Sequence, residues 1–229
     1  MHHQRNLLKN MKKNLNRHMS IFYIILSCKP FLETRLKWQR ASWLSGIDSY
    51  IVLTGSIGST DPKVACMNVG DNYESCPHRY YQYIRENDLE SYDWIVFVDD
   101  DTFVFPKRLQ NYLDELDASL PLYVGHLLTY PTDFMSGGAG FCLTKLAYKG
   151  LRDYLLNTDI NYIQFDINGD VTMGLWTKFI PNLNLINSNK FNGSPHTHGD
   201  STTTDVAFTY HYVTEELFKT YGLLLPKNK

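Results

Sequence analysis

An apolar run followed at once by three aspartates constrains this chain more than any other feature. Residues 94–98 read Trp-Ile-Val-Phe-Val, and Asp99, Asp100 and Asp101 come next. Such a run predicts a strand that is buried on both faces of a sheet. Carboxylates beside a buried strand are costly without a partner, because a charge in a low-dielectric interior loses its hydration. A divalent cation at the carboxyl end of the strand explains the triplet, and ligands bind at that end in open α/β sheets.

Helix capping is the simpler alternative for the triplet, since aspartate side chains accept hydrogen bonds from the free N–H groups of a first helical turn. The next helix is expected to begin near Pro106, with proline in its first turn. That start lies too far from Asp99 for capping to explain all three carboxylates. A metal or sugar-nucleotide role is therefore the favoured interpretation.

Strands and helices alternate along the rest of the chain. The predicted strands cover 21–27, 49–54, 94–98 and 122–124, and the predicted helices cover 31–44, 77–87, 106–117, 145–156 and 214–221. Successive β-α-β units give parallel strands with right-handed crossovers. The predicted fold class is therefore α/β, with a Rossmann-like, mostly parallel sheet flanked by helices in a single domain over residues 20–225.

Charge and hydropathy limit the partners of this domain. The formal net charge of −2 gives no electrostatic support for binding nucleic acid. No run of about 20 apolar residues is present, so no transmembrane segment is expected. Residues 1–19 are basic and are expected to form a disordered tail, with a helix on an anionic surface as the alternative.

Further ligand-binding residues are expected beyond the triplet. Residues 136–140 read Ser-Gly-Gly-Ala-Gly. Three glycines in four positions let a ligand approach the main chain, although a tight turn before a strand is the alternative. Asp170 precedes an apolar helix, where its simplest role is an N-cap. His196 and His198 lie in a loop rich in Asn, Ser and Thr and are candidate metal ligands.

The chain resembles the Fringe-type β1,3-glycosyltransferases, which include the T-synthase-like galactosyltransferases, in five stretches: WIVFVDDDTFVFPKRL, LYVGH, MSGGAGFCLTKLAY, GDVTMGLW and FTYHYVTEELF. The stretches follow the family's order, and the resemblance covers about residues 20–225. It implies the type A nucleotide-diphospho-sugar transferase fold. It also implies a UDP-sugar donor and a divalent cation, usually Mn²⁺.

The resemblance assigns the metal ligands. Asp101 would bind the cation directly, and Asp99 would support it while also contacting the donor. Asp100 would face the donor sugar or ribose. His211, in the stretch YHYV, matches the family's late metal-ligand histidine, and His196 is the reserve candidate.

The resemblance also assigns residues to the donor and to catalysis. Gly137 and Gly138 match the loop beside the donor sugar, and Arg79 stands where the family carries a lysine. Asp170 matches the carboxylate that would deprotonate the acceptor hydroxyl as it attacks the anomeric carbon. Asp166 is the second candidate for this base. Gly169 departs from the family, because relatives usually carry an acid there.

The expected activity is therefore that of an inverting, divalent-metal-dependent hexosyltransferase. It would move a hexose from a UDP-sugar to a 3-hydroxyl of an acceptor sugar, on a glycan or a glycosylated protein. An inactive relative that serves as a glycan-binding module or chaperone is the alternative, and the retained aspartates favour the enzyme. A metal-dependent phosphatase would need more ligands, to hold two metals.

Two further expectations concern the cysteines and the location. Cys66 and Cys76 resemble a loop disulfide of the family. Animal relatives carry a membrane anchor, whereas no signal peptide or anchor is recognised here. The expected location is a cytosol-like compartment, or that of a Golgi-type enzyme with a truncated N-terminus.

Overall fold

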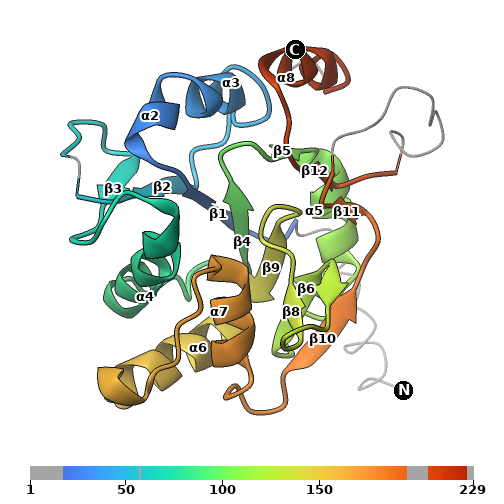
Figure 1. Cartoon of the computed structure of the whole chain (residues 1–229). Coiled ribbons are helices and arrows are strands. Elements are labelled where there is room, and N and C mark those ends of the chain that lie inside the picture. Colours follow the sequence, from blue (N-terminus) through green and yellow to red (C-terminus); the bar gives the residue numbers. More distant parts are fainter. Residues whose placement is uncertain (1–17, 57, 195–205, 226–229) are drawn as a thin grey trace, which may run out of the picture.

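A seven-stranded sheet forms the centre of the computed structural model, which describes residues 18–56, 58–194 and 206–225 (Figure 1). Its strand order is β10-β6-β9-β4-β1-β2-β3. Four neighbouring strands run parallel: β1 (Ile21–Leu26), β2 (Tyr50–Thr54), β3 (Val64–Cys66) and β4 (Trp94–Asp99). β1 and β4 are the buried apolar runs that the sequence predicts to be strands.

The other half of the sheet contains the antiparallel pairs. β9 (Phe141–Thr144) runs antiparallel to β4 and to β6 (Leu122–Gly125). The edge strand β10 (Asn184–Asn187) is parallel to β6. The predicted α/β class with a mostly parallel sheet is confirmed.

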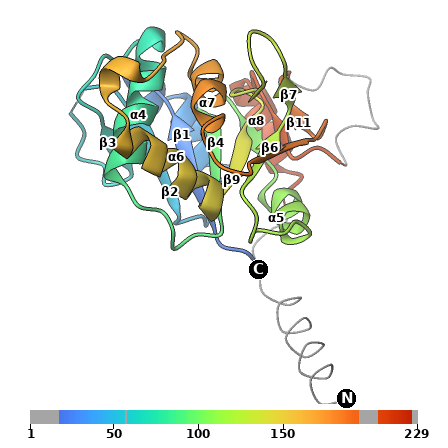
Figure 2. The ribbon, with the colours of Figure 1, turned by 90° about the horizontal axis from the view of Figure 1, so that it is seen from below.

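Helices cover both faces of this sheet (Figure 2). One face carries α3 (Arg35–Arg40), α5 (Pro106–Asp114) and α8 (Glu215–Gly222). The other carries α4 (Cys76–Glu86), α6 (Lys145–Asn157) and α7 (Gly169–Thr177). Side chains of a strand alternate between its faces. In β4, Val96 and Val98 therefore pack in the core beneath α3, α5 and α8. Ile95 and Phe97 pack in the core beneath α4, α6 and α7.

Short elements complete the fold. The three-stranded sheet has the order β11-β12-β5 and consists of β5 (Phe103–Val104), β11 (Phe191–Asn192) and β12 (Thr209–Tyr210). A two-stranded sheet pairs β7 (Leu127–Leu128) with β8 (Phe134–Met135). The remaining elements are α2 (Lys29–Leu32) and the 3₁₀ turns η1 (Tyr73–Ser75) and η2 (Ile160–Tyr162).

The predicted helix over 31–44 is wrong as a single element. The structure divides it into α2 and α3, and Thr34 between them has non-helical dihedrals. The break allows α3 to pack against the loop after β4. There Gln39 donates hydrogen bonds to the carbonyl oxygens of Asp99, at 3.0 Å, and Thr102, at 3.1 Å.

Cys66 and Cys76, the pair that resembles a loop disulfide of the family, are not bridged in the structure, and both carry free thiols. The Cys66 sulfur lies 3.6 Å from Thr54 Oγ1, and the Cys76 sulfur lies 3.4 Å from an Arg79 nitrogen. Each sulfur thus has a polar neighbour of its own.

The N-terminal tail, apart from its last two residues, lies outside the described residues. Met19 is described, and its N–H donates to Asp114 of α5 at 2.9 Å. Within the described ranges, no helix has the length and hydropathy to cross a bilayer.

Candidate functional site

The acidic triplet lies where β1 and β4 end side by side. Leu26 is the register partner of Asp99, so Ser27 comes next to Asp100. The Asp100 carboxylate accepts hydrogen bonds from Ser27 Oγ at 2.7 Å and from Arg35 Nη1 at 2.9 Å. These two donors fix the middle aspartate of the triplet in a buried position.

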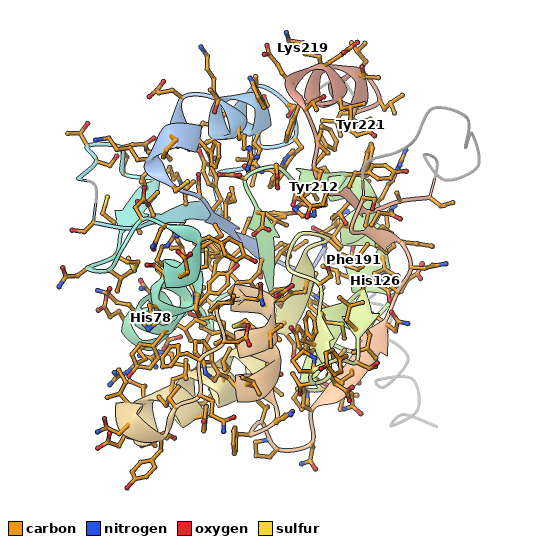
Figure 3. All side chains as sticks on the ribbon, in the orientation of Figure 1. His78, His126, Phe191, Tyr212, Lys219 and Tyr221 are labelled. Carbon is orange, nitrogen blue, oxygen red and sulfur yellow. The ribbon has the colours of Figure 1, made fainter. Side chains whose placement is uncertain are left out.

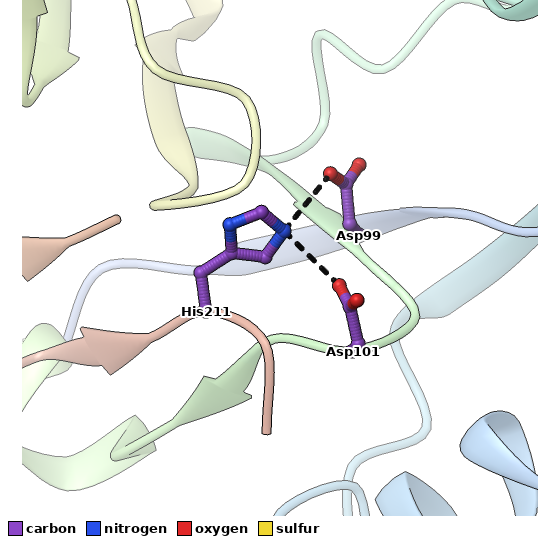
Figure 4. A group of neighbouring side chains, drawn as sticks. All are labelled: Asp99, Asp101 and His211. Carbon is purple, nitrogen blue, oxygen red and sulfur yellow. Dashed lines mark ion pairs between the residues drawn. The ribbon is translucent and has the colours of Figure 1, made fainter. Parts of the chain in front are cut away.

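The other two aspartates meet a histidine from the far end of the chain (Figure 4). His211 Nε2 lies 3.2 Å from Asp101 Oδ1 and 3.8 Å from Asp99 Oδ2. One ligand atom from each residue lies within 4.8 Å of the others. The structure thus brings together the three residues predicted to ligate a metal. The reserve candidate His196 lies outside the described residues.

The small sheet explains how His211 reaches the triplet. β5 begins two residues after Asp101, and its Phe103 pairs with Tyr210 of antiparallel β12. On the other side of the histidine, the Val213 N–H donates to the Asp101 carbonyl oxygen at 2.9 Å. His211 is therefore held opposite Asp101 by main-chain hydrogen bonds on both sides.

Asp170 lies at the start of α7, but it is not the N-cap that its position in the sequence predicted. Asn168 is the N-cap, and Asp170 belongs to the first turn. Its Oδ2 accepts a hydrogen bond from the Gly137 N–H at 2.9 Å, and its Oδ1 accepts from the Val171 N–H at 2.8 Å. A carboxylate in the first turn is also favoured by the helix dipole.

Gly137 and Gly138 are required by their protein neighbours. A Cβ on Gly138 would lie 2.1 Å from Cε1 of His211, and a Cβ on Gly137 would lie 3.0 Å from Cβ of Asp170. The glycine motif therefore lets the histidine and the carboxylate approach the same loop. A side chain at either glycine would crowd Asp170 or His211, which explains why both positions are glycine.

One cavity of about 620 Å³ contains all of these groups. Its volume lies within the range typical of small-molecule sites. The first-choice residues for catalysis, donor and metal all line it: Arg79, Asp99, Asp100, Asp101, Gly137, Gly138, Asp170 and His211. Asp166 does not line it, and its Oδ1 accepts hydrogen bonds from Asn168.

Two arginines line the cavity, and they differ in burial and in hydrogen-bond partners. Arg79 is fully buried and donates to the carbonyl oxygens of Ser27 and Asn72, so much of its hydrogen-bonding capacity serves the cavity wall. Arg35 is more exposed and lies 3.3 Å from Asp101 as well as 2.9 Å from Asp100. Arg35 and Ser27 were not identified as site residues from the sequence. The signal was their place after β1, beside the strand that carries the triplet.

The ionisation of the cluster reflects its crowding. Removal from water raises the pKa of Asp99 to about 7; His211 opposes this rise, and Asp101 adds to it. Burial likewise raises the pKa of Asp100 to about 6, against the hydrogen bonds from Ser27 and Arg35. Burial also opposes the ionised forms of Asp101 and His211, but their hydrogen bond lowers the pKa of Asp101 and raises that of His211. A cation would reverse this balance by favouring the ionised carboxylates.

The sequence model of one family matches most of the chain. The Fringe-like model aligns with residues 16–217. The chain belongs to the Fringe-like family. The family is the one that the five sequence stretches resemble, and membership in it identifies the protein as a glycosyltransferase.

Two comparisons extend this result. The Fringe-like chain is 30% identical over 66 residues to chondroitin sulfate synthase 3 of Homo sapiens and of Mus musculus. The match covers 28% of this chain and only 8% of the length of each relative. A crystal structure of a glycosyltransferase involved in the glycosylation of the major capsid of PBCV-1 is similar, with a TM-score of 0.50 and 13% identity. The match covers 89% of this chain and 100% of that one, so the two share a fold.

Proposed function

We propose that this Fringe-like glycosyltransferase uses a divalent cation to transfer a hexose from a UDP-sugar to a 3-hydroxyl of an acceptor sugar, with inversion. The observation that carries the proposal is the convergence of Asp99, Asp101 and His211 in a cavity that also holds Asp170. A cation site and a carboxylate suited to act as a base are the two groups that this reaction needs.

The donor atoms fit the proposed cation. Two carboxylates and one imidazole suit Mn²⁺, and such a set leaves coordination positions for phosphate oxygens. When bound, the cation supplies Lewis-acid stabilisation of the charge that develops on the departing diphosphate. Arg35 stands beside Asp100 and Asp101 and would add positive charge at the same end of the cavity.

Asp170 is placed to act on the acceptor. Each of its oxygens accepts one main-chain hydrogen bond and keeps a lone pair for another donor. In the proposed step, the acceptor oxygen forms a bond to the anomeric carbon as its proton passes to Asp170. The bond from the anomeric carbon to the β-phosphate oxygen breaks, and UDP leaves with that electron pair. One attack of this kind inverts the anomeric configuration.

A glycan acceptor agrees with the relatives. The 30%-identical human and mouse proteins carry the name chondroitin sulfate synthase 3. That name concerns those proteins, and the acceptor of the present chain is proposed as a sugar on a glycan or a glycosylated protein.

The test is a UDP-release screen. UDP-galactose, UDP-N-acetylglucosamine and UDP-glucose are each incubated with the protein and a panel of acceptor sugars, with Mn²⁺ or with EDTA. We expect Mn²⁺-dependent release from one donor, and a β1,3 linkage in the product by NMR. Glycan binding without UDP release from any donor would instead favour the inactive binding module. Release that is unchanged in EDTA would reject the cation.

A further inference from the structure

Two exposed tyrosines line the cavity that holds Asp170. Tyr73 belongs to η1. Tyr212, which is labelled in Figure 3, follows β12. Both line the cavity, yet Tyr73 is 62% exposed and Tyr212 is 61% exposed. Two aromatic rings that line one cavity and stay open to solvent are available to contact a ligand in that cavity.

Tyr73 is anchored by its hydroxyl. Its Oη donates to Oδ1 of Asn168 at 2.9 Å, and Asn168 is the N-cap of the helix that carries Asp170. Partial burial, together with the nearby charge of Asp170, raises the pKa of Tyr73 to about 12, so the hydroxyl stays protonated. The hydrogen bond thus fixes the ring beside the proposed base, while much of the ring remains open to solvent.

Tyr212 is held in an unfavourable backbone conformation. Its φ is +55°, and within the described ranges Asn182 is the only other non-glycine residue with a positive φ. Asparagine tolerates this region, whereas a bulky side chain in it costs about 1–2 kcal/mol. Burial does not offset this cost, since the side chain is mostly exposed. The ring instead stacks on that of His211, with 3.6 Å between the centroids.

Strain at an exposed aromatic residue beside a catalytic cavity is typical of a ligand-binding position. Two classes of ring could stack there: a pyranose, through its C–H face, or the uracil of the donor. The position of Tyr73 favours the pyranose of the acceptor, because Tyr73 is tied to the helix that presents Asp170. The donor nucleotide would instead lie against another part of the cavity wall, which Cys28, Phe31 and Arg35 form on the segment after β1.

We propose that Tyr73 and Tyr212 form the acceptor subsite, in which their rings stack on an acceptor pyranose and direct its hydroxyl to Asp170. This inference rests on the proposed function. It identifies the ligand as a sugar ring with at least one open C–H face, and it separates the acceptor side of the cavity from the nucleotide side.

The kinetic test compares Tyr73→Ala, Tyr212→Ala and the ring-preserving variants Tyr73→Phe and Tyr212→Phe. Tyr162→Ala is the matched control, because Tyr162 is 79% exposed and does not line the cavity. We expect each alanine variant to raise the acceptor KM about tenfold. The donor KM and acceptor-free UDP release should stay within about twofold of wild type in Tyr73→Ala and in Tyr212→Phe, which keeps the ring that stacks on His211. The phenylalanine variants should keep most of the acceptor affinity. A rise in the donor KM alone would assign the rings to uracil, and unchanged kinetics would also reject the proposal.

A binding test separates this inference from the proposed function. Methyl β-galactoside, methyl β-N-acetylglucosaminide and methyl α-fucoside are each added to the protein with Mn²⁺ and UDP, and saturation-transfer NMR is recorded. We expect the ring protons of one glycoside to be saturated in wild type and Tyr162→Ala, but not in the two cavity alanine variants. Binding of this kind without turnover of any UDP-sugar keeps the subsite and rejects the transfer reaction. Saturation from none of the glycosides overturns the subsite.

Discussion

The seven-stranded and three-stranded sheets contribute to one site in different ways. The large sheet delivers Asp99 at the end of a six-residue strand whose first five residues are completely buried. The small sheet consists of two-residue strands and delivers His211 just after β12. The difference shows that the large sheet fixes the position of the acids, whereas the candidate cation site depends on how the small sheet is docked.

Side-chain hydroxyls join the small sheet to the glycine motif. Thr102 Oγ1 donates to the Gly138 carbonyl oxygen at 2.8 Å, and Thr209 Oγ1 donates to the Ala139 carbonyl oxygen at 2.5 Å. Both threonines are completely buried. The position of His211 is thus coupled to the loop that also holds Asp170.

The largest effect is expected at Asp101, where the two sheets meet. Asp101→Asn removes the charge that faces His211 and one of the three candidate ligands. We expect Mn²⁺ affinity, measured by EPR titration, to fall at least about a hundredfold, and transfer to fall below detection. Asp61→Asn is the control, since Asp61 pairs with Arg40 outside the cavity. Unchanged Mn²⁺ binding in Asp101→Asn would remove the triplet from the cation site.

Asp170 should separate catalysis from cation binding. Asp170→Asn keeps the size of the side chain but cannot take up the acceptor proton. We expect kcat to fall about 10²- to 10⁴-fold, while Mn²⁺ and UDP bind as in wild type by calorimetry. Asp166→Asn should remain close to wild type, because Asp166 does not line the cavity. The opposite ranking would move the base to Asp166.

A smaller effect is expected at the glycine motif. A Cβ at residue 138 would overlap the His211 ring, so Gly138→Ala must displace either the histidine or the loop. We expect Mn²⁺ affinity to fall about tenfold, as when a residue that orients a metal ligand is lost. Gly222→Ala is the control, because its Cβ would come no closer than 3.6 Å to a described atom, Ser42 Cβ, and Gly222 does not line the cavity. Equal affinities in the two variants would show that the position of His211 does not depend on this close contact.

The same contrast between the sheets explains what the sequence could predict. β1, β2 and β4 are predicted to within about one residue, because long apolar runs make strong signals. Two-residue strands have no period to detect, so the small sheet was not predicted, and His211 was identified by resemblance alone. The place of Arg35 after β1 can be read from the sequence, but its pairing with Asp100 depends on tertiary packing between α3 and the end of β4.

Two conservative substitutions should give the smallest and most informative effects. Thr209→Val removes a buried hydroxyl that ties the small sheet to the glycine motif, and Ile25→Val removes one methylene from the core of the large sheet. Each should lower the free energy of unfolding by about 1 kcal/mol in urea titrations. Only Thr209→Val should also weaken Mn²⁺ binding, by about two- to fivefold, since about 0.4–1 kcal/mol of lost docking energy corresponds to that range. Equal weakening in both variants would mean that the cation site follows global stability and that the small sheet has no separate part in holding His211.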